Sequence, residues 1–309
     1  MNGILYTVTV FIWGSTWLAI AYQLGDTPIV VSVAWRFGLA SIVLLAILKL
    51  RNALPRLSIE NHKVSALLAL CLFSNNFLCF YYATEYLPSG LNAVVFSLAP
   101  ILNAFNLWLL EKQRPSGVFL QGALMGFTGV VLLFASQFMS AAMDLGVLKG
   151  LLLSILGTYF FSMGNMVSAR SQKKEMPLLP TTAWAMGYGA IYLVVIALFM
   201  GLPLSVTMDA TYLSALVYLA IIGSVVGFNT YLALVGRIGA AKAAYCTVLF
   251  PLVALSLSTI FEGYEWTWIS VLGVVLVLAG NLRVFGMPEF VVAESARLNR
   301  EMKKLTDKS

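Results

Sequence analysis

Arg36 places a permanent cation roughly seven residues inside an apolar run that begins at Ile29. Charge is expensive in an apolar medium, so such a side chain needs a partner or a wet cavity. It could clamp the carboxylate of a substrate or act as a gating contact. Alternatively, it lies near the end of the run, where a long side chain reaches water or bonds helix-end carbonyls.

Polar side chains inside apolar runs form a second set of candidates. Amides stand beside aromatic rings at 75–82 and at 228–231. An amide can hold the polar end of an amphiphilic solute while rings contact its apolar body, although asparagines also bond neighbouring helices. The predicted binding residues are Trp13, Ser15, Thr16, Arg36, Asn75, Asn76, Tyr81, Tyr82, Asn103, Tyr159, Asn165, Asn229 and Tyr231.

Residues typical of catalysis or metal binding are scarce. The sequence has one histidine, His62 in a polar loop, and its three cysteines lie in apolar runs without metal-ligand spacing. No metal, cofactor or catalytic residue is expected, and a membrane enzyme is disfavoured. No Asp or Glu lies near the middle of an apolar run, so a buried proton relay is not visible. Coupling through Glu85 or Glu262 and the absence of coupling both stay open.

The composition indicates that these side chains are carried by membrane-spanning helices. Apolar residues make up 60% of the chain and charged residues 10%, against about 45–50% and about 25% in soluble domains. The mean hydropathy is +0.89. The net charge of +6 sits in short loops and in the tail, which disfavours nucleic-acid binding.

Ten apolar runs are long enough to cross a membrane, because about 20 residues at 1.5 Å each match the hydrocarbon core. The first run lacks the basic n-region and the small-residue cleavage site of a signal peptide, and its length suits a retained span. The expected spans are Gly3–Gln23, Ile29–Lys49, Lys63–Glu85, Leu91–Leu110, Pro115–Ser136, Gly146–Ser168, Pro180–Met200, Tyr212–Val235, Ala240–Phe261 and Glu265–Phe285.

Loop charges alternate along the chain and predict the orientation. Basic residues gather in every second loop, at Lys49, Arg51, Arg56, Lys63, Lys112, Arg114, Arg170, Lys173, Lys174, Arg237 and Lys242. In the other loops Lys149 is the only basic residue, among Asp26, Glu85, Asp144, Asp209, Glu262 and Glu265. The positive-inside rule therefore places both termini in the cytoplasm.

The chain repeats its own plan after 151 residues. The matched pairs are Pro100 with Pro251, Glu111 with Glu262, Gly122 with Gly273 and Gly129 with Gly280. Such a period indicates an internal duplication. An odd number of spans in each copy makes the second copy enter the membrane from the opposite side, as in many secondary transporters.

The predicted fold is therefore an all-α membrane protein of ten transmembrane helices, arranged as two inverted five-helix repeats. The first repeat is expected at 1–137, the second at 146–286, and a basic cytoplasmic tail at 287–309. Pro100 and Pro251 are candidate hinges, since proline removes a helical hydrogen bond, although a packing kink is the alternative. Glu111 and Glu262 are interpreted as helix-end residues rather than proton carriers.

Several motifs resemble the EamA-type drug/metabolite transporters. They are Trp13-Gly14-Ser15-Thr16, Arg36-Phe37, Pro100…Glu111, Gly122…Gly129, Gly239-Ala240-Ala241-Lys242-Ala243-Ala244, Pro251…Glu262 and Gly273…Gly280. The resemblance covers Gly3 to Phe285. It implies a ten-helix fold with a central cavity that moves small metabolites, often amino acids or toxic organic compounds, commonly outward.

The expected function is the export or exchange of a small organic metabolite, an amino acid or an amphiphilic compound, by alternating access. An importer or a nucleotide-sugar-type carrier is the alternative within transport, and a structural membrane protein is a further one. The expected partners are a small-molecule substrate and the lipid bilayer, with no nucleic acid, and the sequence also allows a homodimer. The expected location is a bacterial-type inner membrane.

Overall fold

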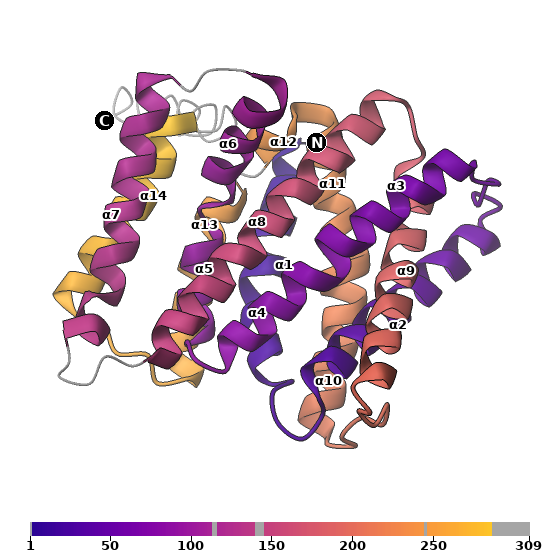
Figure 1. Cartoon of the computed structure of the whole chain (residues 1–309), viewed down its shortest axis with the longest axis horizontal. Coiled ribbons are helices and arrows are strands. Elements are labelled where there is room, and N and C mark those ends of the chain that lie inside the picture. Colours follow the sequence, from indigo (N-terminus) through magenta and orange to yellow (C-terminus); the bar gives the residue numbers. More distant parts are fainter. Residues whose placement is uncertain (1, 113–115, 140–144, 244–245, 286–309) are drawn as a thin grey trace, which may run out of the picture.

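The computed structural model describes residues 2–112, 116–139, 145–243 and 246–285, and all regular structure in these residues is helical. The tail predicted at 287–309 lies outside them. Figure 1 shows the helices lying side by side as one bundle, with several of them inclined to one another.

The first five runs give helices α1 to α7. They are α1 (Asn2–Ala21), α2 (Ile29–Leu50), α3 (Ile59–Leu70) continued by η1 (Cys71–Asn75) and α4 (Asn76–Thr84), α5 (Ser89–Phe96) with α6 (Ala99–Glu111), and α7 (Gly117–Met139).

The second five runs give the remaining helices. They are α8 (Leu145–Lys173), α9 (Leu178–Phe199), α10 (Ala210–Tyr218) continued by η2 (Leu219–Val226) and α11 (Gly227–Ile238), α12 (Ala240–Ala243) with α13 (Cys246–Phe261), and α14 (Trp268–Phe285).

These helices account for the ten expected spans within the described residues. Seven runs are long and apolar enough to cross a membrane by themselves, and three shorter apolar helices, Gly117–Leu133, Leu249–Phe261 and Trp268–Arg283, complete the set. Large apolar side chains such as Phe127 and Ile191 point outward from the bundle. A surface of this kind is suited to lipid rather than water.

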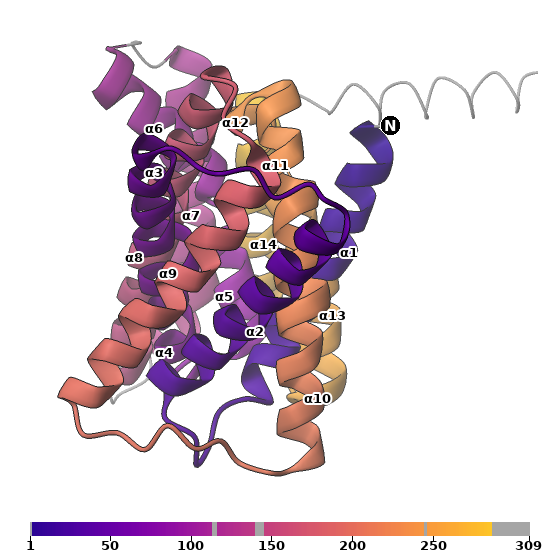
Figure 2. The same ribbon diagram turned by 90° about the vertical axis from the view of Figure 1, so that its right-hand side faces the viewer.

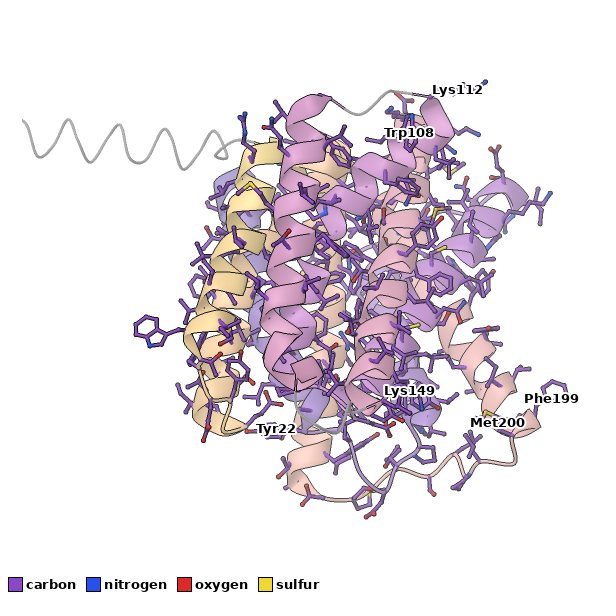
Figure 3. The ribbon with its side chains drawn as sticks, turned by 60° about the vertical axis from the view of Figure 1, so that its left-hand side comes forward. Tyr22, Trp108, Lys112, Lys149, Phe199 and Met200 are labelled. Atoms are coloured by element: carbon purple, nitrogen blue, oxygen red, sulfur yellow. The ribbon has the colours of Figure 1, made fainter. Side chains whose placement is uncertain are left out.

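The connecting loops lie at the two opposite ends of the bundle. The start of α1, the start of α3 and the end of α6 lie at one end, and the α1–α2 and α9–α10 loops lie at the other (Figure 2). Figure 3 shows Trp108 and Lys112 at the first end, and Tyr22, Lys149 and Phe199 at the second. The lone basic residue of the acidic loops, Lys149, donates to the Tyr86 hydroxyl at 2.6 Å and lies 4.7 Å from the centre of its ring.

Close contacts between glycines show that the two halves run in opposite directions. A Cβ atom at Gly129 of α7 would lie 2.6 Å from the carbonyl oxygen of Gly273 in α14, and one at Gly280 would lie 2.5 Å from that of Gly122. The order along one helix is the reverse of the order along the other, so these equivalent helices are antiparallel. Glycine allows the two helices to approach this closely, and a larger residue at these positions would force them apart.

The remaining helix contacts follow the same two-fold relation. α1 packs against α11 and α13, while its equivalent, α8, packs against α4 and α6. α2 packs against its own equivalent, α9, where the Ser41 hydroxyl donates to the carbonyl of Ala183 at 2.8 Å. The inverted five-helix repeat predicted from the sequence is therefore the architecture of the molecule.

Both halves contain a π-helical turn at equivalent places, η1 in the third span and η2 in the eighth. The Ser74 hydroxyl donates to the carbonyl of Ala69 at 2.8 Å, and the Ser224 hydroxyl donates to that of Leu219 at the same distance. Each bond reaches back five residues, which fits the wider turn, and such turns occur frequently at functional sites.

The two repeated prolines occupy different local structures. The fourth span is interrupted at 97–98, and Pro100 lies in the first turn of α6, where its missing N–H breaks no helical bond. The fourth span is thus broken directly before Pro100 and does not continue as one regular helix. Pro251 lies inside α13, as expected for a kink-forming proline. The role of either proline as a hinge stays a prediction.

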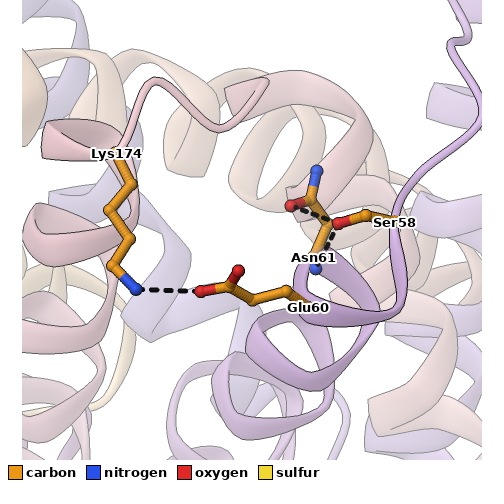
Figure 4. A network of polar contacts seen from close by, with 4 residues as sticks. All are labelled: Ser58, Glu60, Asn61 and Lys174. Carbon is orange, nitrogen blue, oxygen red and sulfur yellow. Dashed lines mark hydrogen bonds and ion pairs between the residues drawn. The ribbon is translucent and has the colours of Figure 1, made fainter.

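Side-chain caps begin several helices. The Ser58 hydroxyl accepts from the backbone N–H of Asn61 at 3.2 Å, and nearby Lys174 pairs with Glu60 at 2.8 Å, joining α8 to α3 (Figure 4). Both partners of the pair are largely exposed, so it contributes little to stability. At the opposite end Asp209 caps α10, and the backbone N–H of Tyr212 holds the pKa of its carboxyl below the ordinary value.

Candidate functional site

A cavity lies between the two halves, enclosed by helices from both. It is narrow in this conformation, with a volume of about 30 Å³. Three of the described residues that line it are polar, one is aliphatic and the rest are aromatic. They are Trp13, Thr16, Trp17, Ile20, Arg36, Asn76, Phe77, Phe80, Phe96, Phe161, Phe228 and Phe250.

α1 contributes a continuous stripe to this wall. Trp13, Thr16, Trp17 and Ile20 follow the spacing of one helical face. The Thr16 hydroxyl donates to the carbonyl of Trp13 at 2.9 Å, so its proton stays within the helix. The Trp13 indole N–H donates to the carbonyl of Gly223 in η2 at 3.3 Å. α1 is thereby fixed to the eighth span beside the cavity.

The two indoles organise the rings of the cavity. Trp13 lies 4.9 Å from Phe228 and 5.8 Å from Phe161, centre to centre. Trp17 lies 5.2 Å from Phe80 in an edge-to-face arrangement and 5.7 Å from Phe96. Such geometry is favourable for aromatic pairs. The resulting wall is apolar, polarisable and supplied by helices of both halves.

Arg36 extends into this wall and not toward the end of the bundle. Only 1% of the residue is exposed. Its Nε donates to the Ser224 hydroxyl at 3.1 Å, and its Nη1 to the Tyr81 hydroxyl at 3.4 Å. The guanidinium also lies over the ring of Phe77, 4.3 Å from its centre. The snorkelling alternative is therefore wrong.

The groups that hold Arg36 are themselves fixed. The Tyr81 hydroxyl donates to Oε1 of Gln23 at 2.7 Å, and the Ser224 hydroxyl donates to the backbone within η2. Both hydroxyls thus use their protons elsewhere and offer lone pairs to the arginine. The π-helical turn positions Ser224 for this contact.

Asn76 is the other polar group of the predicted set that lines the cavity with a free donor. Its Oδ1 accepts from the backbone N–H of Phe77 at 2.8 Å. Its side-chain nitrogen donates to no residue of the described part of the chain. Trp13, Thr16, Arg36 and Asn76 are therefore the predicted residues that the structure brings together on the cavity, with Tyr81 directly behind them.

A second group of predicted residues lies apart from the cavity lining. Asn103 of α6 donates to the carbonyl of Ala240 at 3.3 Å and accepts from Asn165 of α8 at 3.5 Å. The ring of Tyr231 packs against Trp13, 4.7 Å between centres. These contacts join helices, as in the interhelical alternative.

The remaining predicted residues are also placed outside the lining. Ser15 lies 2.6 Å from the Tyr218 hydroxyl, Asn75 accepts from Tyr192 at 3.4 Å, and Asn229 donates to the carbonyl of Val225 at 2.6 Å. Tyr82 and Tyr159 are half-buried, and neither lines the cavity.

The predicted binding residues lack the apolar part of the lining. Phe77, Phe80 and Phe228 lie in the aromatic segments that the sequence singled out, whereas Trp17, Ile20, Phe96, Phe161 and Phe250, and the supporting residues Gln23 and Ser224, were missed. The helical spacing from Trp13 could have identified Trp17 and Ile20. Nothing in the sequence distinguishes Phe96, Phe161 or Phe250 from rings that face lipid. No group of three His, Cys, Asp or Glu within the described ranges is placed to hold a metal ion.

Glu262 has a structural partner outside the cavity. It accepts from the backbone N–H of Ser89 at 3.3 Å and from the Ser89 hydroxyl. It therefore caps the N-terminus of α5 from the end of the ninth span, in accordance with the helix-end interpretation. The side chain of Glu111 lies outside the described part of the structure.

Comparison with known proteins gives a consistent result over both halves. The pattern of the EamA-like transporter family matches residues 1–135 and again residues 148–285. A Bacillus subtilis protein named "uncharacterized transporter YyaM" is 27% identical over 277 residues, covering 89% of this chain and 90% of that protein. The Escherichia coli "uncharacterized inner membrane transporter YedA" is 27% identical, covering 87% and 88%.

A more distant relative has a more specific name. The Salmonella typhimurium "probable amino-acid metabolite efflux pump" is 23% identical over 317 residues, covering 96% of this chain and 98% of that protein. One crystal structure superposes with a TM-score of 0.66 at 19% identity, covering 91% of this chain and 95% of that one. This likeness shows that the fold is shared.

Proposed function

The chain belongs to the EamA-like transporter family, and from this we propose that it exports or exchanges a small organic metabolite by alternating access. It is an integral membrane transporter and not an enzyme. Its partners are a small-molecule substrate and the bilayer. The observation that carries the proposal is the cavity between two inverted halves, walled by rings and one buried cation.

Alternating access is supported by the two-fold relation of the halves, which we place at 1–137 and 146–286. Two copies of one unit in opposite orientations can exchange conformations, so that a shared cavity opens first to one side and then to the other. The π-helical turns and the interruption at 97–98 are irregular places in the helices, where a helix can bend while the segments on either side stay helical.

Orientation and direction form the finer part of the proposal. The end of the bundle that carries Lys112 has the basic loops, so we assign it, and both termini, to the cytoplasm of a bacterial-type inner membrane. Outward movement is supported by the efflux activity in the name of the Salmonella relative. A nucleotide sugar would require several cations for its diphosphate, whereas Arg36 is the cation on the described cavity wall.

The test is a transport screen with the purified protein in sealed lipid vesicles. Radiolabelled small organic acids, amino acids and amines are loaded or added outside, with and without a pH gradient. We expect saturable movement of at least one solute, absent from protein-free vesicles. Exchange alone, net flux, or flux driven by the gradient would distinguish an exchanger, a facilitator and a proton-coupled carrier. Failure of every solute would contradict the proposal.

Asn76→Ala is expected to reduce transport by about tenfold or more, because a hydrogen-bond donor on the cavity wall is lost. From the sequence alone, Tyr82→Ala and Asn229→Ala are expected to reduce transport as well. In the structure these residues lie outside the lining, and they serve as matched controls with near-normal transport. Initial rates, normalised to the amount of protein in the vesicles, measure the effect. Equal rates for Asn76→Ala and the unchanged protein would remove Asn76 from the site.

A further inference from the structure

The charge of Arg36 has no counter-charge in the described part of the chain. No Asp or Glu of these residues lies within ion-pair distance of its guanidinium. An ionised group in an apolar interior is strongly unfavourable unless it is paired. The rings of Phe77 and Phe37, 4.3 Å and 5.2 Å from the guanidinium carbon, offset only part of this cost.

The arginine also has unused donors. A guanidinium carries five N–H groups, and the structure uses one on Nε and one on Nη1. Nη2 donates to none of the described residues, and it lies near Gly223, 3.5 Å from where a Cβ would stand. Because Ser224 and Tyr81 bind Nε and Nη1 of the guanidinium, its free donors are held in place beside the cavity.

The other polar groups of the cavity also offer a hydrogen-bond donor and no anionic acceptor. The side-chain nitrogen of Asn76 is a free donor, whereas its oxygen is used by Phe77. The Thr16 proton and the Trp13 N–H are used by backbone carbonyls. None of the described lining residues is Asp or Glu. The wall therefore offers donors and a positive charge, and it offers no anionic acceptor for an ammonium group.

Among the described lining residues, the second half supplies no second cation. At the repeat distance of 151 residues, Gly187 stands where the first half has Arg36. The site is thus asymmetric and carries one positive charge among eight rings, which suits one negative charge attached to an apolar body.

We propose that the transported solute is a monoanion with a ring-bearing apolar body, its carboxylate bound by Arg36 and Asn76 and its body held among the rings. This proposal rests on the proposed transport function and specifies its substrate class. A zwitterionic amino acid is a poorer fit, because its ammonium would enter the cavity without an acceptor. An organic cation is excluded by the same argument.

Three probes with the same ring and the same two-carbon spacing separate these classes. They are 3-phenylpropionate, L-phenylalanine and 2-phenylethylamine, which present an anion, a zwitterion and a cation. Binding to the purified detergent-solubilised protein is followed by tryptophan fluorescence, since Trp13 and Trp17 line the cavity. We expect saturable binding of 3-phenylpropionate, about tenfold tighter than that of phenylalanine, and no binding of the amine.

Two variants test the residues. Arg36→Gln is expected to weaken 3-phenylpropionate binding by about tenfold or more, whereas the exposed Lys174→Gln leaves it unchanged. Asn76→Asp keeps the arginine and adds a carboxylate, and it is expected to weaken binding of the anion and to admit the amine. This second variant carries the test if Arg36→Gln does not fold, as judged by its thermal transition.

Three results would overturn the proposal: phenylalanine or the amine binding as tightly as the anion, unchanged anion binding in the variants, or no binding of any probe. In each case the transport screen still decides the proposed function separately. A solute of another class that moves in the vesicles would leave the transporter assignment intact and remove the assigned substrate class.

Discussion

Gly129→Ala is expected to lower the thermal transition of the purified protein markedly and to reduce its recovery from membranes. The added methyl group would lie 2.6 Å from the carbonyl oxygen of Gly273 and 2.7 Å from the backbone nitrogen of Val277. Both obstacles are backbone atoms, so α7 and α14 must move apart. Overpacking of this kind costs about 1–3 kcal/mol.

Gly117→Ala is the matched control, because Gly117 belongs to the same helix and has no neighbouring atom within 4 Å of the added carbon. Thermal unfolding of both variants in the same detergent measures the difference. Gly273→Ala should behave as Gly129→Ala does, since its added carbon would lie 2.7 Å from the carbonyl of Gly129. Equal transitions for Gly129→Ala and Gly117→Ala would contradict the close antiparallel contact.

A disulfide between positions 27 and 207 is expected to stop transport. Thr27 lies in the α1–α2 loop and Thr207 in the α9–α10 loop, so the pair joins the two halves at one end of the bundle. Their hydroxyls lie 3.0 Å apart, and the Thr207 N–H donates to the Thr27 hydroxyl at 2.9 Å. Two cysteines in these places are close enough to be bridged. The bridge would hold that end closed.

In the vesicles, oxidation of the Thr27→Cys, Thr207→Cys double variant should reduce transport to the background rate, and a reducing agent should restore it. Each single variant should keep its rate under the same oxidant. The native cysteines, Cys71, Cys79 and Cys246, are all buried and unpaired. Full transport by the cross-linked protein would show that this end does not need to open.

Much of the architecture could be predicted from the sequence, because the bilayer restricts it strongly. A span needs about 20 apolar residues, and proline, glycine and glutamate are scarce enough for their repeated spacing to reveal the duplication. The glycines of that repeat, Gly122, Gly129, Gly273 and Gly280, lie in close contact across the two-fold relation in the structure.

The composition of the cavity wall was harder to predict. In a membrane protein an aromatic ring can face lipid as readily as the interior, so Phe96, Phe161 and Phe250 carry no distinguishing signal. The π-helical turn η2 changes which face Ser224 occupies, and Ser224 in turn holds Arg36. This change of face cannot be predicted by assigning helix faces from a regular helical period.

In the proposed mechanism, the cavity between the inverted halves is the path of the solute and is reached from each side of the membrane in turn. Thr16 lines that cavity. A Thr16→Cys variant, with the three native cysteines replaced by alanine, can be treated with a membrane-impermeant thiol reagent in sealed vesicles of either orientation.

We expect the cysteine at position 16 to react with the reagent from both sides of the membrane, and to lose its reaction from one side once positions 27 and 207 are cross-linked. Reaction from a single side in the uncross-linked protein, or from neither side, would contradict this mechanism.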